Sequence, residues 1–414
     1  TALSCTLLTT LLTSASAARD INAGNHNALA VNGETVTIKS GAIVQVGSPV
    51  IDGYKGSNSS IAVGQTNNNN ITIEQGGKLN GRIYTRAAKI KDIIINGSIG
   101  AGPSNASIIN FRSTTIEKIE VGTTGVLEGG IINSWFKNGG TASGNSKIDN
   151  IDIKGEVKGG IKNQSGTMQA ISIAGSVSGG IQNDDTMGTL KIENGGSVSG
   201  DIINNKTMQS ISVSNGTVNG NIVNSGTNAN TGNISITGTS DIKGSIVNQN
   251  GATFNNQITL EQGSKLGGIL NNANSTMSGQ LDLKGEVGTI TNAGQFDSTL
   301  TLSNKVGQIN NEESGTISND ITIQANGSVG AINNAGTMQA ITNNATTGTL
   351  TLTNSGGTID KVTNGNGATA TIRNQGKITN GIINDGGTLT VFNDFRKDES
   401  AANGYHTIGE IGKT

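Results

Sequence analysis

Apolar and polar residues alternate in short segments that return about every 20 residues from Ile151 onward. Each segment is a triplet of two apolar residues around one polar residue, as in Ile151-Asp152-Ile153. Alternation with a period of two places both apolar residues on one face of a short strand. The triplets begin at Ile151, Ile171, Leu190, Ile211, Ile234, Ile258, Leu281, Leu300 and Ile321. Their spacing of 19 to 24 residues predicts one supersecondary unit per repeat.

A second element of the repeat follows each triplet: glycines at fixed offsets, and then the pattern Ile-x-Asn. Glycine supplies the backbone freedom that corners need. The recurrent asparagines are Asn163, Asn183, Asn204, Asn224, Asn248, Asn271, Asn292, Asn311 and Asn334. We predict that they turn inward and bond to one another in a structural ladder. An array of asparagines that binds a surface is the alternative.

These elements describe three short strands per repeat, separated by turns. Stacked repeats would pair each strand with its equivalent at about 4.8 Å. The sequence therefore predicts an all-β fold, a right-handed parallel β-helix with coils of about 20 residues. About 18 coils would form a rod on the order of 85 Å long.

The repeat becomes irregular toward both ends of the chain. Residues 19–50 are expected to form an N-terminal cap and first coil, and residues 51–392 the β-helix. A gap of 32 residues between the triplet strands at Ile119 and Ile151 predicts an insertion. Asn364, Asn374 and Asn384 recur every 10 residues, which predicts partial coils. Residues 393–414 depart from the pattern and are expected to begin a junction or a further coil.

Composition supports thin, repetitive β-structure. Aromatic residues make up 2% of the chain and charged residues 14%, with 62 glycines and 2 prolines. So few aromatics cannot fill a large globular core, and the regular β-branched residues argue against disorder. The net charge of -2 does not indicate a nucleic-acid partner.

The start of the chain resembles an export signal. An apolar stretch at residues 3–12 precedes the small residues Ala15, Ala17 and Ala18, which is typical of a secretory signal peptide. We therefore expect residues 1–18 to be a signal peptide that lacks its beginning, with cleavage after Ala17 or Ala18. Lipidation of Cys5, the one cysteine, is the alternative.

The signal, the cysteine-free Gly-, Asn-, Ser- and Thr-rich repeat and the stretch from Ala28 to Ile38 together resemble the passenger domains of Gram-negative autotransporters. The resemblance covers residues 1 to about 392. It implies export to the cell surface, the outer membrane or the medium. It also implies an outer-membrane β-barrel downstream in the full-length protein, and a role as adhesin, toxin or protease.

The sequence gives no support for catalysis. Serine-protease passengers carry a Gly-Asp-Ser-Gly-like motif, which is absent, and the two histidines, His26 and His406, lie at opposite ends of the chain. Paired carboxylates occur as Asp184-Asp185 and Glu312-Glu313, but neighbours along a strand point to opposite faces. We expect no enzyme activity, no catalytic residue, no metal site and no cofactor.

Two places are candidates for partner contact. Trp135 and Phe136 lie in the predicted insertion, and solenoids often bind through insertions. An exposed Trp also makes a good anchor for a protein or glycan. Tyr54 lies in a second, turn-rich segment. Covering a gap in the core is the alternative role for Trp135.

The function that this pattern favours is a surface adhesin or virulence factor that contacts a host-cell protein or glycan. Two other functions stay open. One is a polysaccharide-processing enzyme on a β-helix, and the other is a structural spacer that associates with copies of itself.

Overall fold

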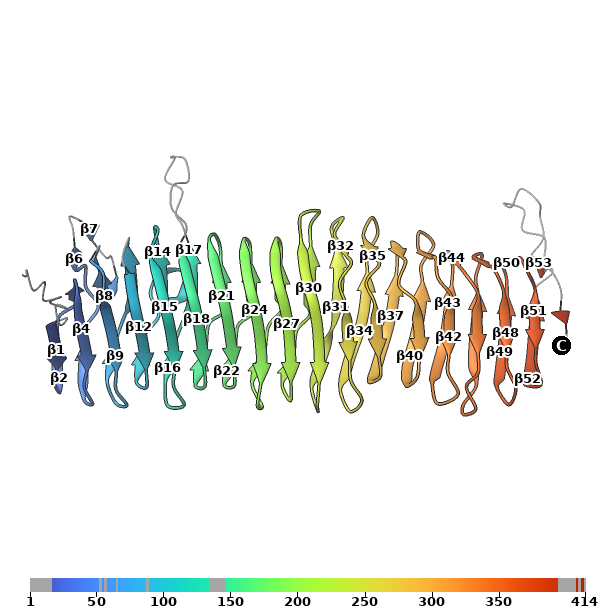
Figure 1. The fold of residues 1–414 in the computed structure, drawn as a ribbon, viewed down its shortest axis with the longest axis horizontal. Helices are drawn as coiled ribbons and strands as arrows, with labels where there is room; N and C mark the ends of the chain where they lie inside the picture. Colours follow the sequence, from blue (N-terminus) through green and yellow to red (C-terminus); the bar gives the residue numbers. More distant parts are fainter. Residues whose placement is uncertain are drawn as a thin grey trace, which may run out of the picture.

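The computed structural model of the chain describes residues 17–51, 54–55, 58–64, 66–86, 89–134, 146–393, 407–408 and 411–412. Figure 1 shows a long rod in which the strands follow one another in chain order from the blue end to the red end. Each strand pairs in parallel with its equivalent one coil later, as Ile151 does with Ile171. The rod has about 17 turns at a spacing of ~21 residues. The predicted all-β parallel β-helix is therefore confirmed.

The first long stack of strands contains the apolar-x-apolar triplets of the N-terminal part. Its members are β1 (Ala17–Ile21), β4 (Glu34–Ile38), β9 (Asn69–Ile73), β12 (Lys89–Ile95), β15 (Thr115–Val121), β18 (Lys147–Ile153), β21 (Thr167–Ile173), β24 (Thr186–Glu193), β27 (Thr207–Ser214), β30 (Asn230–Thr237), β33 (Ile258–Leu260) and β36 (Leu281–Leu283).

The second stack begins as two parallel rows that merge at β31 (Asp241–Gln249). One row is β2 (Gly24–His26), β5 (Ala42–Val44), β10 (Lys78–Leu79), β13 (Ser98–Ile99), β16 (Val126–Leu127), β19 (Glu156–Val157), β22 (Ser176–Val177), β25 (Ser197–Val198) and β28 (Thr217–Val218). The other is β3 (Leu29–Val31), β8 (Ser59–Val63), β11 (Arg82–Arg86), β14 (Ala106–Phe111), β17 (Gly130–Ser134), β20 (Ile161–Asn163), β23 (Ile181–Asn183), β26 (Ile202–Asn204) and β29 (Ile222–Ser225). The merged strands continue as β34 (Lys265–Asn271), β37 (Glu286–Asn292), β40 (Lys305–Asn311), β43 (Ser328–Asn334), β46 (Leu350–Asn354), β49 (Thr369–Asn374) and β52 (Thr388–Asn393).

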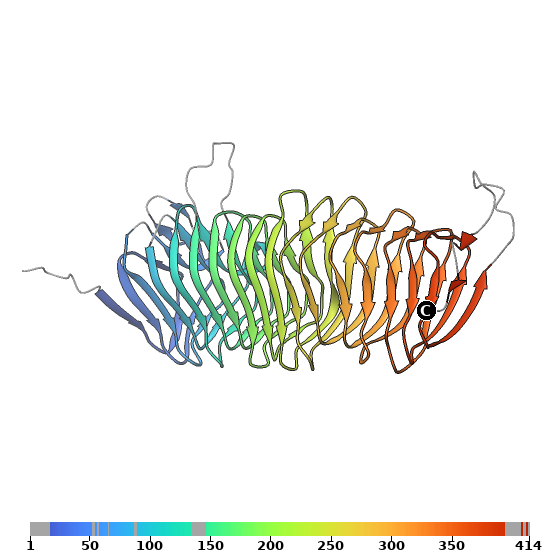
Figure 2. The same ribbon diagram turned by 45° about the vertical axis from the view of Figure 1, so that its right-hand side comes forward.

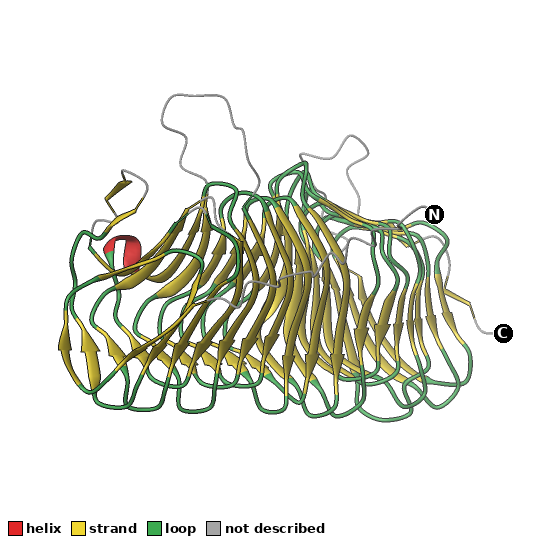
Figure 3. Ribbon diagram, turned by 60° about the vertical axis from the view of Figure 1, so that its left-hand side comes forward, coloured by secondary structure: helices red, strands yellow, loops and turns green. Residues whose placement is uncertain are grey.

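Two shorter stacks complete the coils of the C-terminal part. One holds β32 (Thr253–Phe254), β35 (Thr276–Met277), β38 (Gln295–Phe296), β41 (Thr316–Ile317), β44 (Thr337–Met338), β47 (Thr358–Ile359), β50 (Lys377–Ile378) and β53 (Thr407–Ile408). The other holds β39 (Leu300–Leu302), β42 (Ile321–Ile323), β45 (Ile341–Asn343), β48 (Val362–Asn364), β51 (Ile382–Asn384) and β54 (Ile411–Gly412). The hairpin of β6 (Val50–Ile51) and β7 (Tyr54–Lys55) is antiparallel. The short helix η1 (Pro103–Asn105) is red in Figure 3.

The corner of the coil moves between the two halves of the rod. In the N-terminal half, Met168 and Ile171 are three residues apart within one strand, β21, while Val157 and Ile161 are four apart and lie in separate strands. In the C-terminal half, Leu266 and Ile269 are three apart within β34. Where two inward side chains are four residues apart, as Val157 and Ile161 are, the strand ends between them and the chain turns a corner. The change in slope of the strands along the rod is visible in Figure 2.

One continuous core runs along the axis from Ile21 to Ile382. It consists almost entirely of stacked Ile, Val and Leu side chains, joined by Phe254 and Phe296. All five methionines, at the slot after a threonine or its equivalent, are at most 1% exposed. Like residues lie on like residues because most pairings keep one register, as in Met168↔Met187, while the pairs β8–β11, β9–β12, β14–β17 and β31–β34 each contain a register shift.

The predicted asparagines are buried and form a row of side-chain hydrogen bonds inside the corner. Each Nδ2 donates to the Oδ1 of the asparagine one coil later, at 2.8 to 3.0 Å from Asn133 to Asn204 and again from Asn224 to Asn334. The row extends beyond the predicted set to Asn110 at one end and Asn393 at the other. These bonds satisfy polar groups that water cannot reach.

One link in this row differs from the prediction. Asn204 donates to the hydroxyl of Thr231, which in turn donates to Asn224, both at 2.9 Å. Thr231 occupies the slot that methionine fills in the preceding coils, opposite Met208. A short polar side chain there reaches the asparagines where a methionine cannot.

The expected partial coils near the C-terminus are absent, and that prediction was wrong. Asn364 and Asn384 belong to a second row, with Asn343, on β45, β48 and β51. Asn374 belongs to the main row, between Asn354 and Asn393. Two rows with whole-coil spacing interleave in the sequence, and this produces the apparent recurrence every 10 residues.

The ends of the described chain also contain coil strands. β1 begins at Ala17 and pairs with β4, so the segment expected to form the N-terminal cap and first coil contains stacked strands. Residues 1–16 of the predicted signal lie outside the described residues. At the other end, β53 and β54 pair with β50 and β51 and continue the stacking.

Replacing Asn292 by Ala should lower the free energy of unfolding by about 2 kcal/mol, because buried partners lose their bonds. Asn292 accepts from Asn271 and Gly294 and donates to Gly294, Asn311 and Thr316. The shift in the urea midpoint measures the effect. The neighbouring outward residue provides a control, Thr291→Ala, and equal shifts in the two variants would contradict the role of the ladder.

Candidate functional site

The predicted insertion lies within one coil. β15 and β18 pair directly, with Ile119 opposite Ile151, so the added length does not separate neighbouring coils. Trp135 and Phe136, the predicted contact residues, lie outside the described residues. Tyr54 lies in β7, where its backbone pairs with Ile51. Contact through these three aromatic residues stays a prediction.

The carboxylate pair Asp184-Asp185 is held by neighbouring side chains. Asp184 accepts hydrogen bonds from Gln182 at 2.9 Å and from Asn205 at 2.7 Å. Asp185 forms an ion pair with Lys206 at 2.7 Å. Because these partners lie on the same or adjacent coils, the two carboxylates support the stacking of coils.

The other titratable candidates lie apart. Glu312 and Glu313 are exposed in a turn that follows β40. The ring of His26 contacts the carbonyl of Asn22 at 2.7 Å, and His406 lies outside the described residues. Among the described residues, the structure therefore does not bring His26 to either glutamate.

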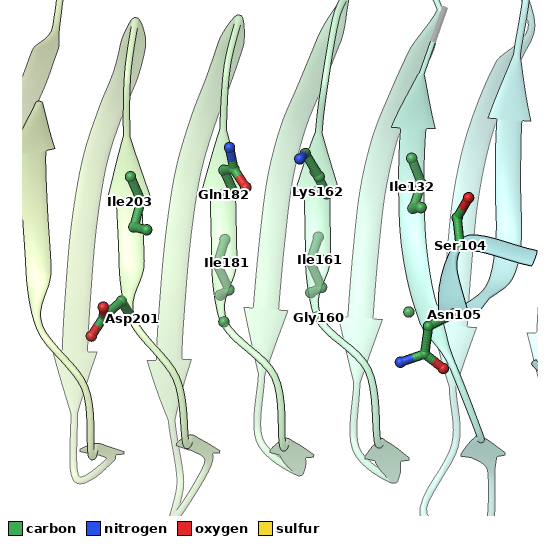
Figure 4. A pocket seen from close by; sticks show the side chains of 12 residues that line it. Ser104, Asn105, Ile132, Gly160, Ile161, Lys162, Ile181, Gln182, Asp201 and Ile203 are labelled. Carbon is green, nitrogen blue, oxygen red and sulfur yellow. The ribbon is translucent and has the colours of Figure 1, made fainter. Parts of the chain in front are cut away.

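A shallow groove crosses successive coils on the row of strands β17, β20, β23 and β26, with a volume of about 390 Å³. Its outward side chains, Ile132, Lys162, Gln182 and Ile203, are register partners from coil to coil, as Figure 4 shows. The remaining lining residues are Ser104, Asn105, Gly130, Gly160, Ile161, Gly180, Ile181 and Asp201. We call this the glycine groove. Its volume lies in the lower part of the range for small-ligand sites.

Glycines create the floor of the glycine groove. Gly130, Gly160 and Gly180 occupy equivalent positions in three coils, and the carbonyls of Gly160 and Gly180 accept hydrogen bonds from Ile131 and Ile161 of the preceding coil. A Cβ on Gly160 would lie 2.5 Å from the carbonyl oxygen of Gly180, which is too close for any side chain. The next position in the row is Asp201, which accepts a hydrogen bond from the Asn221 amide at 2.7 Å.

The walls of the groove combine apolar and polar groups suited to binding. Ile132 and Ile203 are half-buried although they point outward. Lys162 lies 3.9 Å from Asp184, which also binds Gln182. The amide of Gln182 and the paired charge of Lys162 therefore lie between the apolar side chains of Ile132 and Ile203.

Outward apolar residues were missed by sequence reasoning. Next to the groove, Tyr84 and Ile132 pack against a cluster of Ala106, Ile109 and Phe111 on the outside of the coil. The signal was present at the middle position of Ile-x-Asn, which is apolar in several coils and faces outward there. This middle position attracts little notice in the sequence, because the Ile and Asn on either side of it already account for the fold.

Two lysines and two acidic residues on and beside the first stack form ion pairs with one another. Lys154 pairs with Glu120 at 3.2 Å and with Asp152 at 3.0 Å, and Lys118 also contacts Glu120. The hydrogen bond from Lys118 holds the pKa of Glu120 below its ordinary value of 4.5, although partial burial acts in the opposite direction.

Because the pKa of Glu120 is lowered in the folded state, its contribution to stability is present above pH 4.5 and is lost as the pH falls through the folded pKa. The variant Glu120→Gln should lower the free energy of unfolding at pH 7 by at most about 1 kcal/mol. Urea midpoints of the two proteins should converge below pH 4.5. The exposed Glu312→Gln controls for loss of charge. A difference between Glu120→Gln and wild type that persists at low pH would contradict this account.

Comparison with known proteins gives no match: no family model fits the chain, and no curated protein is similar to it. Within the described ranges, no three His, Cys, Asp or Glu side chains are grouped to hold a metal ion. The helices of the described part include none long and apolar enough to cross a membrane. The fold is that of a β-solenoid, and the glycine groove is one hollow on its outward surface.

Proposed function

We propose that the chain is an exported passenger of the autotransporter type and acts as an adhesin at the cell surface or after release. Its partner is a protein or glycan on a host cell. The apolar stretch at residues 3–12 and the small residues after it support export.

The observation that carries this proposal is the division of the coil into an interior of aliphatic side chains and bonded asparagines and an exterior of mostly polar side chains. Inward positions hold aliphatic side chains and bonded asparagines. Outward positions repeat polar side chains from coil to coil, as in Thr186↔Thr207 and Ser212↔Ser235. A rod of this kind presents a long contact surface whose shape is fixed by the stacking.

The glycine groove gives the proposed contact a location on this surface. It lies on one face of the rod and combines apolar contacts at Ile132 and Ile203 with the amide of Gln182. Apolar anchors with polar neighbours are typical of interaction sites. The acids held in structural bonds, Asp184 and Asp185, favour binding over the polysaccharide-processing alternative.

The variant Ile203→Lys should weaken binding of the purified chain to epithelial cells about tenfold, because it places a charge at an apolar contact. Thr353→Lys is a matched control, since Thr353 lies on the same outward row of the merged strands, outside the groove. A Trp135→Ala, Phe136→Ala variant tests the predicted insertion in parallel. Binding is measured by flow cytometry with labelled protein.

Loss of binding in Ile203→Lys but not in Thr353→Lys supports the groove as the contact site. Loss only in the double aromatic variant moves the contact to the insertion. A wild-type chain that binds no host cells would contradict the adhesin proposal. If it instead clumps the cells that display it, self-association is the function.

A further inference from the structure

A second groove runs along the rod on the first stack, across β21, β24, β27 and β30, with a volume of about 440 Å³. One side is a row of register partners, Thr167, Thr186, Thr207 and Asn230. Since coils stack at about 4.8 Å, this row offers a hydroxyl or amide at each such step. We call it the glutamine groove.

Glutamine and glycine alternate along the floor, two residues after each member of that row. The order is Gln169, Gly188, Gln209 and Gly232. A Cβ on Gly188 would lie 1.9 Å from the Gln169 carbonyl oxygen, and one on Gly232 would lie 1.8 Å from that of Gln209. The backbone therefore excludes side chains at the two glycines, so exposed glutamine side chains occur only in every second coil of this row.

The polar groups of this groove are available for a ligand. Gln169 and Gln209 are exposed, and in the described part of the chain their side-chain amides have no hydrogen-bond partner. The lining residues carry no charge, and the nearby Asp185 and Lys206 neutralise each other at 2.7 Å. Asn256 closes one end by donating to Asn230 at 3.2 Å.

We propose that the glutamine groove binds a linear, neutral polysaccharide that lies parallel to the rod with one sugar per coil. Sugar hydroxyls both donate and accept hydrogen bonds, as glutamine amides and threonine hydroxyls do. An extended β-linked hexose chain advances per sugar by nearly the same distance as one coil. The sugar rings would lie beside the side chains of Gln169 and Gln209, over the glycine positions that carry no side chain.

The same features disfavour other polymers. β24 and β27 are paired on both sides, so a peptide cannot add to the sheet as a strand at this place. A neutral lining lacks the cations that bind nucleic acid or acidic polysaccharides. The inference rests on the proposed contact function and names a ligand class for a second face of the rod.

Calorimetric titration of the full chain with β-1,4-linked glucose oligomers, from the dimer to the hexamer, tests this inference. Affinity should rise with length up to the tetramer, because the groove crosses four coils, and then level off. A Gln169→Ala, Gln209→Ala variant should bind about tenfold more weakly, since two hydrogen-bonding amides are lost. Gln339→Ala is the matched control, because Gln339 follows the same Thr-Met pair outside the groove.

Three results would overturn the inference: no binding of any neutral oligomer, equal binding by the double glutamine variant, or equal affinity for acidic oligogalacturonate. A chain that adheres to cells but binds no oligomer refutes this site alone and leaves the adhesin proposal intact. Oligomer binding with no cell adhesion supports this site and refutes the adhesin.

Discussion

Parallel pairing between successive coils is the constraint on which the structure depends. Each residue lies about 4.8 Å from its equivalent in the next coil, so a side chain that fits at one level must fit against a copy of itself. Ile on Ile meets this condition in the core, as at Ile151↔Ile171. Asn on Asn meets it in the corner, since each amide donates to the next and accepts from the one before. Glycine on glycine meets it where backbones approach too closely for a side chain.

This constraint explains which structural features could be predicted from the sequence. Inward positions must repeat, so the triplets and the recurrent asparagines were visible in the chain, and with them the fold. The path of the corner was harder to see. It depends on whether three or four residues separate two inward side chains, as with Met168 and Ile171 against Val157 and Ile161. Near the C-terminus, two interleaved rows of asparagine gave one misleading period.

The candidate site could be predicted less well, for the same physical reason. Outward side chains are not forced to repeat, so the row of Ile132, Lys162, Gln182 and Ile203 changes residue type from coil to coil, and its position in Ile-x-Asn is the one sign of it in the sequence. Its groove arises from the glycines beneath it and from the neighbouring short helix η1, which contributes Ser104 and Asn105. The sequence instead favours Trp135, Phe136 and Tyr54 as contact residues, because aromatic residues are rare in this chain. The inward side chains of the rod contact one another, so a partner can contact only outward rows such as this one. In this way the stacked fold supports the proposed adhesin function.

The central claim is that the coils stack continuously through the rod, across β31 where two rows of strands merge and the register shifts by one residue between Ile242 and Ser245. Spin labels test it in a background of Cys5→Ser, with one label at Lys162→Cys and the other at Asn310→Cys or Asn333→Cys. Seven coil steps separate Lys162 from Asn310, which predicts a narrow distance distribution near about 34 Å, and about 5 Å more for Asn333. A broad distribution, or no increase between the two pairs, would contradict the continuous stack.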